Sequence, residues 1–297
     1  MVTPILFSVS YSGSWGQAHL SVEQFVDKAA ELGYQGVMLG GKRPHLSPLD
    51  WDDAARAALR RRIDAAGLEH VVVAGYNNFT ADLEHAEVPM REIQVAYVKE
   101  LSRLALEIGG DKVRIFTGYE HSTAGYLPQW NLVVDCLKEC AQNAAEFGIT
   151  LAVQNHHDLG ADFRSHKDLL EAVGEPNCRA GFDAWSPALH GVDLAEAATA
   201  MASLTVHTTV ADYQRRPRFV YEPDAVNYRS VTPYSQAVPM GEGFLDYEGF
   251  FSALQAGGFD GTVAYEMCSP LLGGGSEENL DRHATRFLEY LKALPPS

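Results

Sequence analysis

The strongest constraint on the fold is an alternation of strand-like and helix-like segments that repeats eight times along the chain. The strand-like segments are short apolar runs, which we expect at residues 5–9, 37–39, 70–75, 112–116, 149–154, 178–183, 203–207 and 261–266. Helical segments separate them, expected at residues 22–32, 51–66, 89–108, 130–147, 166–173, 194–201, 247–255 and 277–294. Such alternation predicts parallel strands joined by right-handed crossovers, and eight units predict an α/β fold, a (β/α)8 TIM barrel.

One segment interrupts this rhythm. Residues 208–245, which follow the seventh strand, show little hydrophobic periodicity and are rich in arginine and tyrosine. A loop of this length in a compact domain is usually functional, and arginine and tyrosine are also enriched at protein interfaces. The sequence therefore predicts one domain over residues 1–297, with residues 208–245 as a lid over the site or an arm at a subunit interface.

Charge and composition limit the partners of the chain. The formal net charge of −16 argues against binding to nucleic acid or to an anionic membrane surface. No apolar run approaches the roughly 18 residues of a membrane helix. The opening segment MVTPILFSVSYSG has neither a basic start nor a cleavage pattern, and only four cysteines are present. We therefore expect a cytoplasmic protein that contacts neither nucleic acid nor a membrane.

Polar residues end four of the predicted strands. They are Gln154, Asp183, His207 and Glu266, on strands five to eight. In a barrel of parallel strands, the carboxyl ends of the strands meet at one mouth, where active sites form. Two carboxylates, an imidazole and an amide oxygen would suit a divalent ion such as Mn²⁺ or Mg²⁺. The pattern thus predicts a metal site at the mouth.

Five motifs carry a resemblance to a known family. They are QNHHD at 154–158, FDAWSP at 182–187, VHTTVAD at 206–212, GEGFLDY at 241–247 and FDGTVAYE at 259–266. The chain resembles the xylose isomerase-like TIM barrels, the sugar-phosphate isomerase/epimerase superfamily, over nearly its whole length. The resemblance implies one divalent metal ion, with Mn²⁺ as the first choice and Mg²⁺ or Co²⁺ as alternatives. Its ligands would be Gln154, Asp183, His207 and Glu266, where the family has Glu, Asp, His and Glu.

Two departures from the family pattern bear on mechanism. In the epimerases, the glutamate at the position of Gln154 doubles as an acid/base group, and an amide has no proton to exchange. The family also often has an acidic residue three positions after the strand-seven histidine. Here Val210 occupies that place and Asp212 comes later, so the sequence assigns Asp212 no role.

Candidate catalytic residues follow from side-chain alternation along a strand. If Gln154 points into the mouth, Asn155 points away and His156 points in again, so His156 becomes the candidate general base, with an ordinary pKa near neutrality. His157 is the alternative base, and Glu266 is a second acid/base candidate. Candidate substrate-binding residues near the strand ends and in the long loop are His157, Trp185, Arg216, Trp15 and Tyr76.

These features define a predicted reaction. We expect a metal-dependent enzyme that removes a proton next to the carbonyl of a keto-sugar or oxidised glycoside, followed by β-elimination, as in a lyase, a dehydratase or a C-glycoside-cleaving enzyme. Loss of the carboxylate at Gln154 favours elimination over reprotonation, because the usual reprotonating partner is missing. The alternatives are a sugar isomerase or epimerase, and a non-catalytic barrel subunit or sugar-binding module. The expected partners are a small sugar or glycoside and either further copies of the chain or a second subunit.

Overall fold

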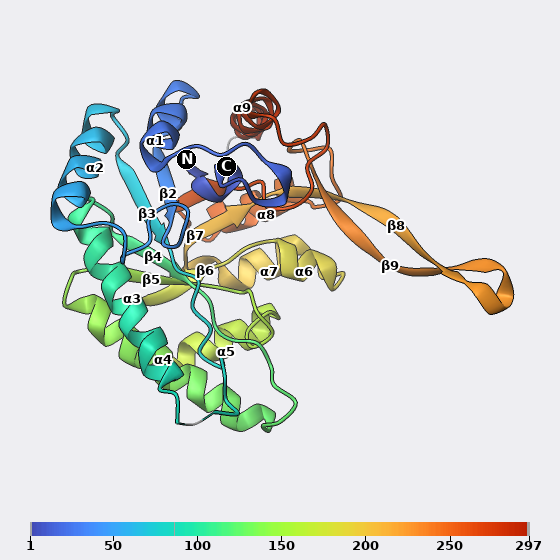
Figure 1. The fold of residues 1–297 in the computed structure, drawn as a ribbon, viewed down its shortest axis with the longest axis horizontal. Coiled ribbons are helices and arrows are strands. Elements are labelled where there is room, and N and C mark those ends of the chain that lie inside the picture. Colours follow the sequence, from blue (N-terminus) through green and yellow to red (C-terminus); the bar gives the residue numbers. More distant parts are fainter. Residues whose placement is uncertain (1, 86, 296–297) are drawn as a thin grey trace.

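A closed barrel of parallel strands forms the centre of the protein (Figure 1). The computed structural model describes residues 2–85 and 87–295. Around the barrel the strand order is β1-β10-β7-β6-β5-β4-β3-β2. These strands are β1 (Thr3–Phe7), β2 (Gly36–Gly40), β3 (His70–Ala74), β4 (Lys112–Ile115), β5 (Thr150–Gln154), β6 (Cys178–Gly181), β7 (Thr205–Val210) and β10 (Thr262–Tyr265). The predicted (β/α)8 TIM barrel is confirmed.

Helices follow the barrel strands and cover the outside of the barrel (Figure 1). Six of the helices within the described residues have a short polar side chain as N-cap. In the first helix, Ser21 and Gln24 form a reciprocal capping box. None of the helices within the described residues is long and apolar enough to cross a membrane. The helices are α1 (Val22–Glu31), α2 (Asp53–Ala65), α3 (Met90–Glu107), α4 (Tyr126–Ala145), α5 (Phe163–Val173), α6 (Trp185–Leu189), α7 (Leu194–Met201), α8 (Tyr247–Ala256) and α9 (Glu277–Ala293).

The hydrophobic core has two parts. The larger part lies between the outer faces of the strands and the helices, and alternate residues of each strand contribute to it. The smaller part lies inside the barrel and contains Ile5, Phe7, Val9, Met38, Val72, Ala74 and Ala264. On β5, β6, β7 and β10 the inward positions near the carboxyl ends are instead polar, which marks this end of the barrel as the place for a site.

The seventh strand differs from its predicted bounds. It runs from Thr205 to Val210 instead of ending at residue 207. Its continuation, Thr208-Thr209-Val210, is β-branched throughout and pairs with β10. His207 therefore lies in the middle of a strand, and Thr209 is the next inward residue toward the mouth.

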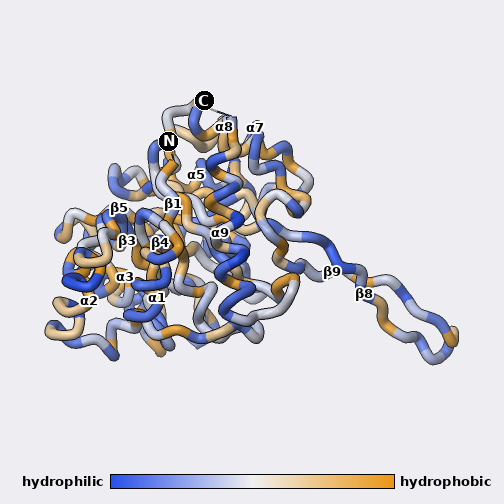
Figure 2. Tube along the Cα trace, turned by 90° about the horizontal axis from the view of Figure 1, so that it is seen from above, coloured by the Kyte–Doolittle hydropathy of each residue, from blue (hydrophilic) through white to orange (hydrophobic). Residues whose placement is uncertain are grey.

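Most of the segment predicted as an irregular loop forms a regular hairpin. Strands β8 (Asp212–Glu222) and β9 (Asn227–Val238) pair antiparallel and are joined by a short turn that contains Pro223–Ala225. The hairpin projects far beyond the barrel in two perpendicular views (Figures 1 and 2). The sequence did not predict this regular structure, because the strands are exposed on both faces and no buried face imposes a period of two.

Candidate functional site

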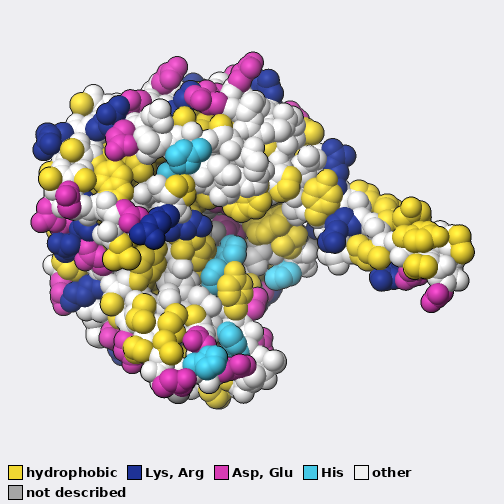
Figure 3. Space-filling model, in the orientation of Figure 1, with side chains coloured by type: hydrophobic (Ala, Val, Ile, Leu, Met, Phe, Trp, Pro, Cys, Tyr) yellow, Lys and Arg dark blue, Asp and Glu magenta, His cyan; other side chains and the backbone are white. Residues whose placement is uncertain are grey.

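A cavity of about 180 Å³ opens at the carboxyl ends of β5, β6, β7 and β10. Figure 3 shows the molecule hollowed beside the base of the hairpin, with histidine side chains along the hollow. The cavity combines acidic, amide, hydroxyl, thiol and aromatic side chains from six segments of the chain. Its lining residues are Gln154, His156, Asp183, Trp185, Thr209, Ala211, Tyr213, Ser235, Tyr247, Glu266, Cys268 and Ser269.

Hydrogen bonds tie the ends of β5 and β6 together. The Gln154 side-chain amide donates to the Asp183 carboxylate, and the Trp185 backbone N–H donates to the same carboxylate at 3.1 Å. Asn155 points away from the cavity and bonds the backbone of Asp183 twice. Its Oδ1 accepts from the Asp183 N–H at 2.7 Å, and its Nδ2 donates to the Asp183 carbonyl at 3.0 Å. Burial raises the pKa of Asp183 to about 6, although its hydrogen-bond donors oppose the shift. Asp183 is thus held in one orientation by at least three neighbours.

Glu266 lies directly after β10 and is held more loosely. Its backbone N–H donates to the Val210 carbonyl at 3.0 Å, which continues the pairing of the two strands. Among the described residues, its carboxylate accepts a single hydrogen bond, from the Cys268 thiol at 3.1 Å. Burial raises the pKa of Glu266 to about 7; nearby Asp183 raises it further, while Cys268 and Arg114 lower it. Its carboxylate is therefore suited to exchanging protons near neutral pH.

His207 is not among the residues that line the cavity, and its Nε2 is buried without a hydrogen-bond partner within the described residues. Its role as a metal ligand stays a prediction. Its side chain is fully buried inside the barrel, and its Nδ1 lies 2.8 Å from the Thr262 hydroxyl. Burial lowers its pKa to about 3, so the ring is neutral. Thr209, two residues further along the strand and on the same face, lines the cavity instead. Its hydroxyl is buried without a hydrogen-bond partner within the described residues.

The position of Thr209 also explains Asp212. Counted from Thr209, the acidic residue three positions on is Asp212, the spacing that the family resemblance gives between the strand-seven histidine and an acidic residue. The Asp212 carboxylate accepts backbone N–H groups of Gly241 and Gly243, at 3.0 and 2.8 Å. A Cβ at Gly243 would collide with that carboxylate. Asp212 therefore fixes the Gly-Glu-Gly turn at the base of the hairpin.

His156 lines the cavity as predicted, but its chemistry differs from the expectation. Its Nδ1 accepts the backbone N–H of His157 at 2.8 Å, which puts the proton of a neutral ring on Nε2. The enclosing walls and the charge of Arg114 lower the pKa of His156 below its usual range. A neutral ring with an Nε2–H is a hydrogen-bond donor, so the prediction of a general base with a pKa near neutrality is not supported.

The five predicted substrate-binding residues separate into two groups. Trp185 lines the cavity, with its ring centroid 4.3 Å from that of Tyr213. The other four do not line it. His157 stacks against Phe116 and Tyr119, Tyr76 packs against Arg114, Trp15 is exposed on the loop after β1, and Arg216 is exposed on the hairpin.

Arg114 is a functional candidate that the sequence prediction missed. It lies on β4, only 2 % exposed, and donates to the Gly75 carbonyl at 2.9 Å while its guanidinium packs on Phe116. Its positive charge lowers the pKa of both Asp183 and Glu266. A charged residue at the centre of the apolar run KVRIF was the available signal, because such a residue is rarely buried without a purpose.

The residues at the mouth do not fit the four-ligand metal set that the family resemblance implies. Gln154 presents its N–H to Asp183, and the cavity is lined on β7 by the hydroxyl of Thr209 and not by the imidazole of His207. Within the described residues, no three His, Cys, Asp or Glu side chains are placed to hold a metal ion.

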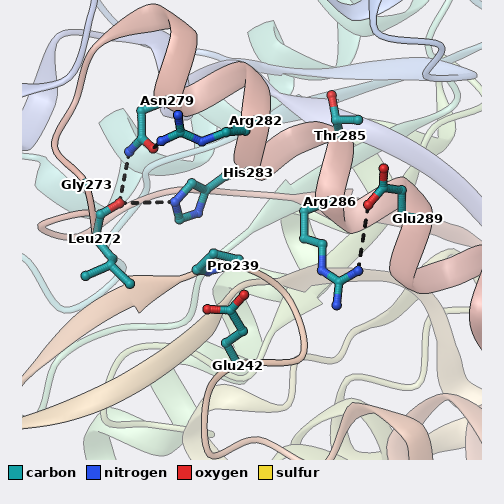
Figure 4. Close-up of a pocket in the computed structure, with 10 residues that line it drawn as sticks. All are labelled: Pro239, Glu242, Leu272, Gly273, Asn279, Arg282, His283, Thr285, Arg286 and Glu289. Atoms are coloured by element: carbon teal, nitrogen blue, oxygen red, sulfur yellow. Dashed lines mark hydrogen bonds and ion pairs between the residues drawn. The ribbon is translucent and has the colours of Figure 1, made fainter.

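A second and larger cavity, of about 500 Å³, lies between α9 and the loops after β9 and β10 (Figure 4). Its polar side chains are largely engaged with one another: Arg282 donates to Asn279, Arg286 pairs with Glu289 at 3.7 Å, and His283 contacts the Leu272 carbonyl. No residue at the carboxyl end of a barrel strand is among the residues that line it. The smaller cavity at the barrel mouth is therefore the candidate site.

Comparisons with known proteins agree with this architecture. Inosose dehydratase of Lacticaseibacillus casei is 22% identical over 261 residues, which cover 83% of this chain and 82% of that protein. The structure of D-psicose 3-epimerase from Clostridium cellulolyticum H10 matches with a TM-score of 0.75 at 16% identity, covering 99% of both chains. D-allulose 3-epimerase from Methylomonas sp. matches with a TM-score of 0.73 at 14% identity, over 99% of this chain and 98% of that chain.

At such low identity, the structural matches speak for the fold alone. A family model supplies the stronger assignment, because it matches residues 26–291, most of the chain. The matched segment includes every residue that lines the cavity at the barrel mouth. The chain belongs to the xylose isomerase-like TIM barrel family.

Proposed function

We propose that this chain is a sugar-modifying enzyme that removes the proton next to a carbonyl and then expels a β-substituent. The substrate class is a keto-sugar or an oxidised glycoside. Support comes from the names of its relatives, an inosose dehydratase and several sugar 3-epimerases, and from the acidic, amide and hydroxyl side chains that line the cavity beside Trp185. One observation carries the proposal: two carboxylates share the cavity, and one of them is far less constrained than the other.

Glu266 is the proposed acid/base group. A base must change its hydrogen bonds as it takes and returns a proton, and Glu266 has one weak thiol donor to lose. Asp183 instead accepts bonds from Gln154 and from the Trp185 backbone, which hold it as an acceptor. A pKa of about 7 keeps both protonation states of Glu266 populated at neutral pH. Asp183 is then proposed to bind substrate hydroxyl groups.

The proposed elimination uses a single acid/base group. The Glu266 carboxylate takes the proton from the carbon beside the carbonyl, and the electron pair of that C–H bond forms a C=C bond. The bond between the β-carbon and its oxygen substituent breaks, and the departing oxygen receives the same proton from Glu266. The product is an unsaturated ketone plus water or an alcohol, and the reaction needs no external oxidant or reductant.

The neighbouring residues would stabilise the charge that develops on the carbonyl oxygen. The His156 Nε2–H is a neutral donor at the cavity wall, and Arg114 adds a buried positive charge behind it. Preorganised donors of this kind act strongly in a site that excludes water. Because the mouth does not fit the expected metal set, the proposal assigns the acid–base step and the charge stabilisation to these residues.

Isomerisation or epimerisation is the second candidate. It is favoured by Asp183, a second carboxylate with a pKa raised to about 6, which would reprotonate the intermediate from another side. In that case the substrate keeps its β-substituent and the product is a stereoisomer or a positional isomer of the starting sugar.

Incubation in D₂O distinguishes these reactions. Purified protein is mixed with an inosose, D-fructose, or a 3-keto-glucoside, and the products are followed by NMR and mass spectrometry. Elimination gives a product lighter by water or an alcohol, whereas isomerisation gives a product of unchanged composition that carries deuterium. Glu266→Gln should abolish either signal. Glu289→Gln, a change in the other cavity, should leave it intact. If the wild-type protein neither exchanges the proton nor alters any of the three sugars, the enzyme proposal gives way to a non-catalytic barrel.

A further inference from the structure

We propose that the hairpin is a dimerisation arm that docks onto the barrel of a second copy of this chain. The arm is defined here as residues 215–234, the part of β8 and β9 beyond the base that contacts the cavity. It extends well clear of the barrel in both views of the backbone (Figures 1 and 2). The proposal concerns assembly, and it does not depend on the reaction proposed for the barrel mouth.

The arm lacks packing of its own. From Arg215 to Tyr234, every residue is exposed except Glu222 and Val231, which are half-buried. A two-stranded hairpin without a third strand or a helix against it is at best marginally stable in water. An arm of this length therefore needs a surface to pack against, and its own barrel does not supply one.

The two faces of the arm differ in chemistry. Residues paired across an antiparallel hairpin lie on the same face, so Tyr221 and Tyr228 share a face with Phe219 and Ser230. The exposed fractions of Phe219, Tyr221 and Tyr228 are 60%, 47% and 66%. The opposite face carries Arg218, Val220, Glu222 and Arg229, with the last arginine bonded to Glu222 at 2.5 Å.

This aromatic face is the docking surface. Three large aromatic side chains on one exposed face are unusual for a segment that faces only water, and they are typical of the centre of a protein interface. Hydrophobic side chains cover much of the arm in the space-filling view (Figure 3). The charged face on the other side places Arg218 and Arg229 at the margin of this contact, where they can approach acidic side chains of the partner.

Charge identifies the partner as another copy of this chain. The arm has four arginines against two acidic residues, Glu222 and Asp224, which gives it a net charge of +2. Because the whole chain carries −16, the remainder of the chain carries −18. A basic, aromatic arm is thus complementary to the acidic barrel that every copy carries. A symmetric pair of copies would use two such contacts, one in each direction.

Docking of the arm would also reach the candidate site. Tyr213 and Ser235, at the base of the hairpin, line the cavity, and Ser235 pairs with Arg215 at the start of the arm. The base of the hairpin therefore joins the cavity wall to the arm that would hold the second copy. In this arrangement, assembly and the geometry of the cavity wall are linked.

Sedimentation velocity of the full chain tests the proposal. At micromolar concentration and low salt, the wild-type protein should sediment with twice the 32.5 kDa mass of the chain. The variant Phe219→Ser/Tyr221→Ser/Tyr228→Ser should sediment as a single chain. Its circular dichroism should match wild type, because the arm does not support the barrel. High salt should weaken the wild-type dimer on the order of tenfold, since opposite charges attract across the contact.

A variant on the opposite face provides the matched control. Val220→Ser/Val231→Ser removes apolar surface from the same arm but leaves the aromatic face intact, and it should remain a dimer. A wild-type protein that sediments as a single chain would overturn the proposal, and so would a triple variant that remains a dimer. A dimer that tightens in high salt would contradict the charge argument for a second copy.

Discussion

The two sides of the barrel mouth differ in how firmly they hold their polar groups. On the β5/β6 side, Gln154, Asn155 and Asp183 form a network that includes backbone and side-chain bonds. On the β7/β10 side, Thr209 has no partner within the described residues and Glu266 has a single thiol donor. We call these the fixed side and the open side.

The difference indicates which side performs the chemistry. A fixed carboxylate orients a ligand well but exchanges its hydrogen bonds poorly, whereas an open one can take up and release a proton. The desolvated environment raises the pKa on both sides, so the hydrogen-bond partners, and not burial alone, distinguish the two acids. Each prediction below changes one side and compares it with the other.

The largest expected effect is on catalysis. Glu266→Gln, the change on the open side, should reduce kcat/KM by about 10³-fold, because the amide cannot accept the substrate proton. Asp183→Asn should reduce kcat/KM by about 10-fold, mainly through KM, because Asn keeps an oxygen that accepts hydrogen bonds. Steady-state kinetics of both variants check this order. Equal losses in kcat for the two variants would remove the distinction between the sides.

A smaller effect is expected on stability, with a defined pH dependence. Because burial raises the folded pKa of Glu266 from 4.5 to about 7, its ionisation opposes folding as pH rises through that interval. Glu266→Gln should therefore raise the free energy of unfolding by about 2 kcal/mol at pH 8 and change it little at pH 4. Asp183→Asn should raise the free energy of unfolding less at pH 8, since this variant loses the charge-assisted bonds from Gln154 and Trp185.

Urea unfolding at both pH values measures this effect. Glu242→Gln, at the rim of the other cavity, serves as the control and should leave the free energy of unfolding unchanged at either pH. If Glu266→Gln destabilised the protein at pH 8, its carboxylate would have to make stabilising contacts that the open side does not show.

The smallest expected effect concerns Cys268. Its thiol donates to the Glu266 carboxylate and thereby lowers the pKa of that group. Cys268→Ala should raise the pKa, so the acidic limb of the kcat/KM profile, where the base becomes protonated, should move to higher pH. Cys268→Ser, which keeps a donor, should restore the wild-type position. If the acidic limb of the kcat/KM profile did not move in Cys268→Ala, Glu266 would not be the group that titrates in that limb.

Much of the fold, and part of the site, could be predicted from the sequence. Eight apolar runs separated by helices define the barrel, and Gln154, Asp183 and Glu266 come to its mouth because each run stops at a polar residue that faces inward. The position of Asn155 away from the cavity also follows from strand alternation. Its bonds to Asp183 depend on how two strand ends meet, which spacing along the chain does not reveal.

The errors have a common physical cause. Polar β-branched residues extend a strand without marking its end, so Thr208 and Thr209 carried β7 three residues past the predicted stop, to Val210. A shift of two keeps a side chain on the same face but moves it one layer deeper, which removed His207 from the cavity lining. The hairpin was missed because a strand exposed on both faces has no buried face to impose a period.

The central claim is that the mouth lacks the four-ligand metal site because Gln154 and Thr209 replace two of the ligands. Equilibrium dialysis of chelator-treated protein against Mn²⁺ tests it most directly, with wild type compared to the double variant Gln154→Glu/Thr209→His. The account predicts that the double variant binds one Mn²⁺ per chain about 100-fold more tightly than wild type. Wild-type protein that holds one tightly bound Mn²⁺ per chain, and loses it in His207→Ala, would contradict the account.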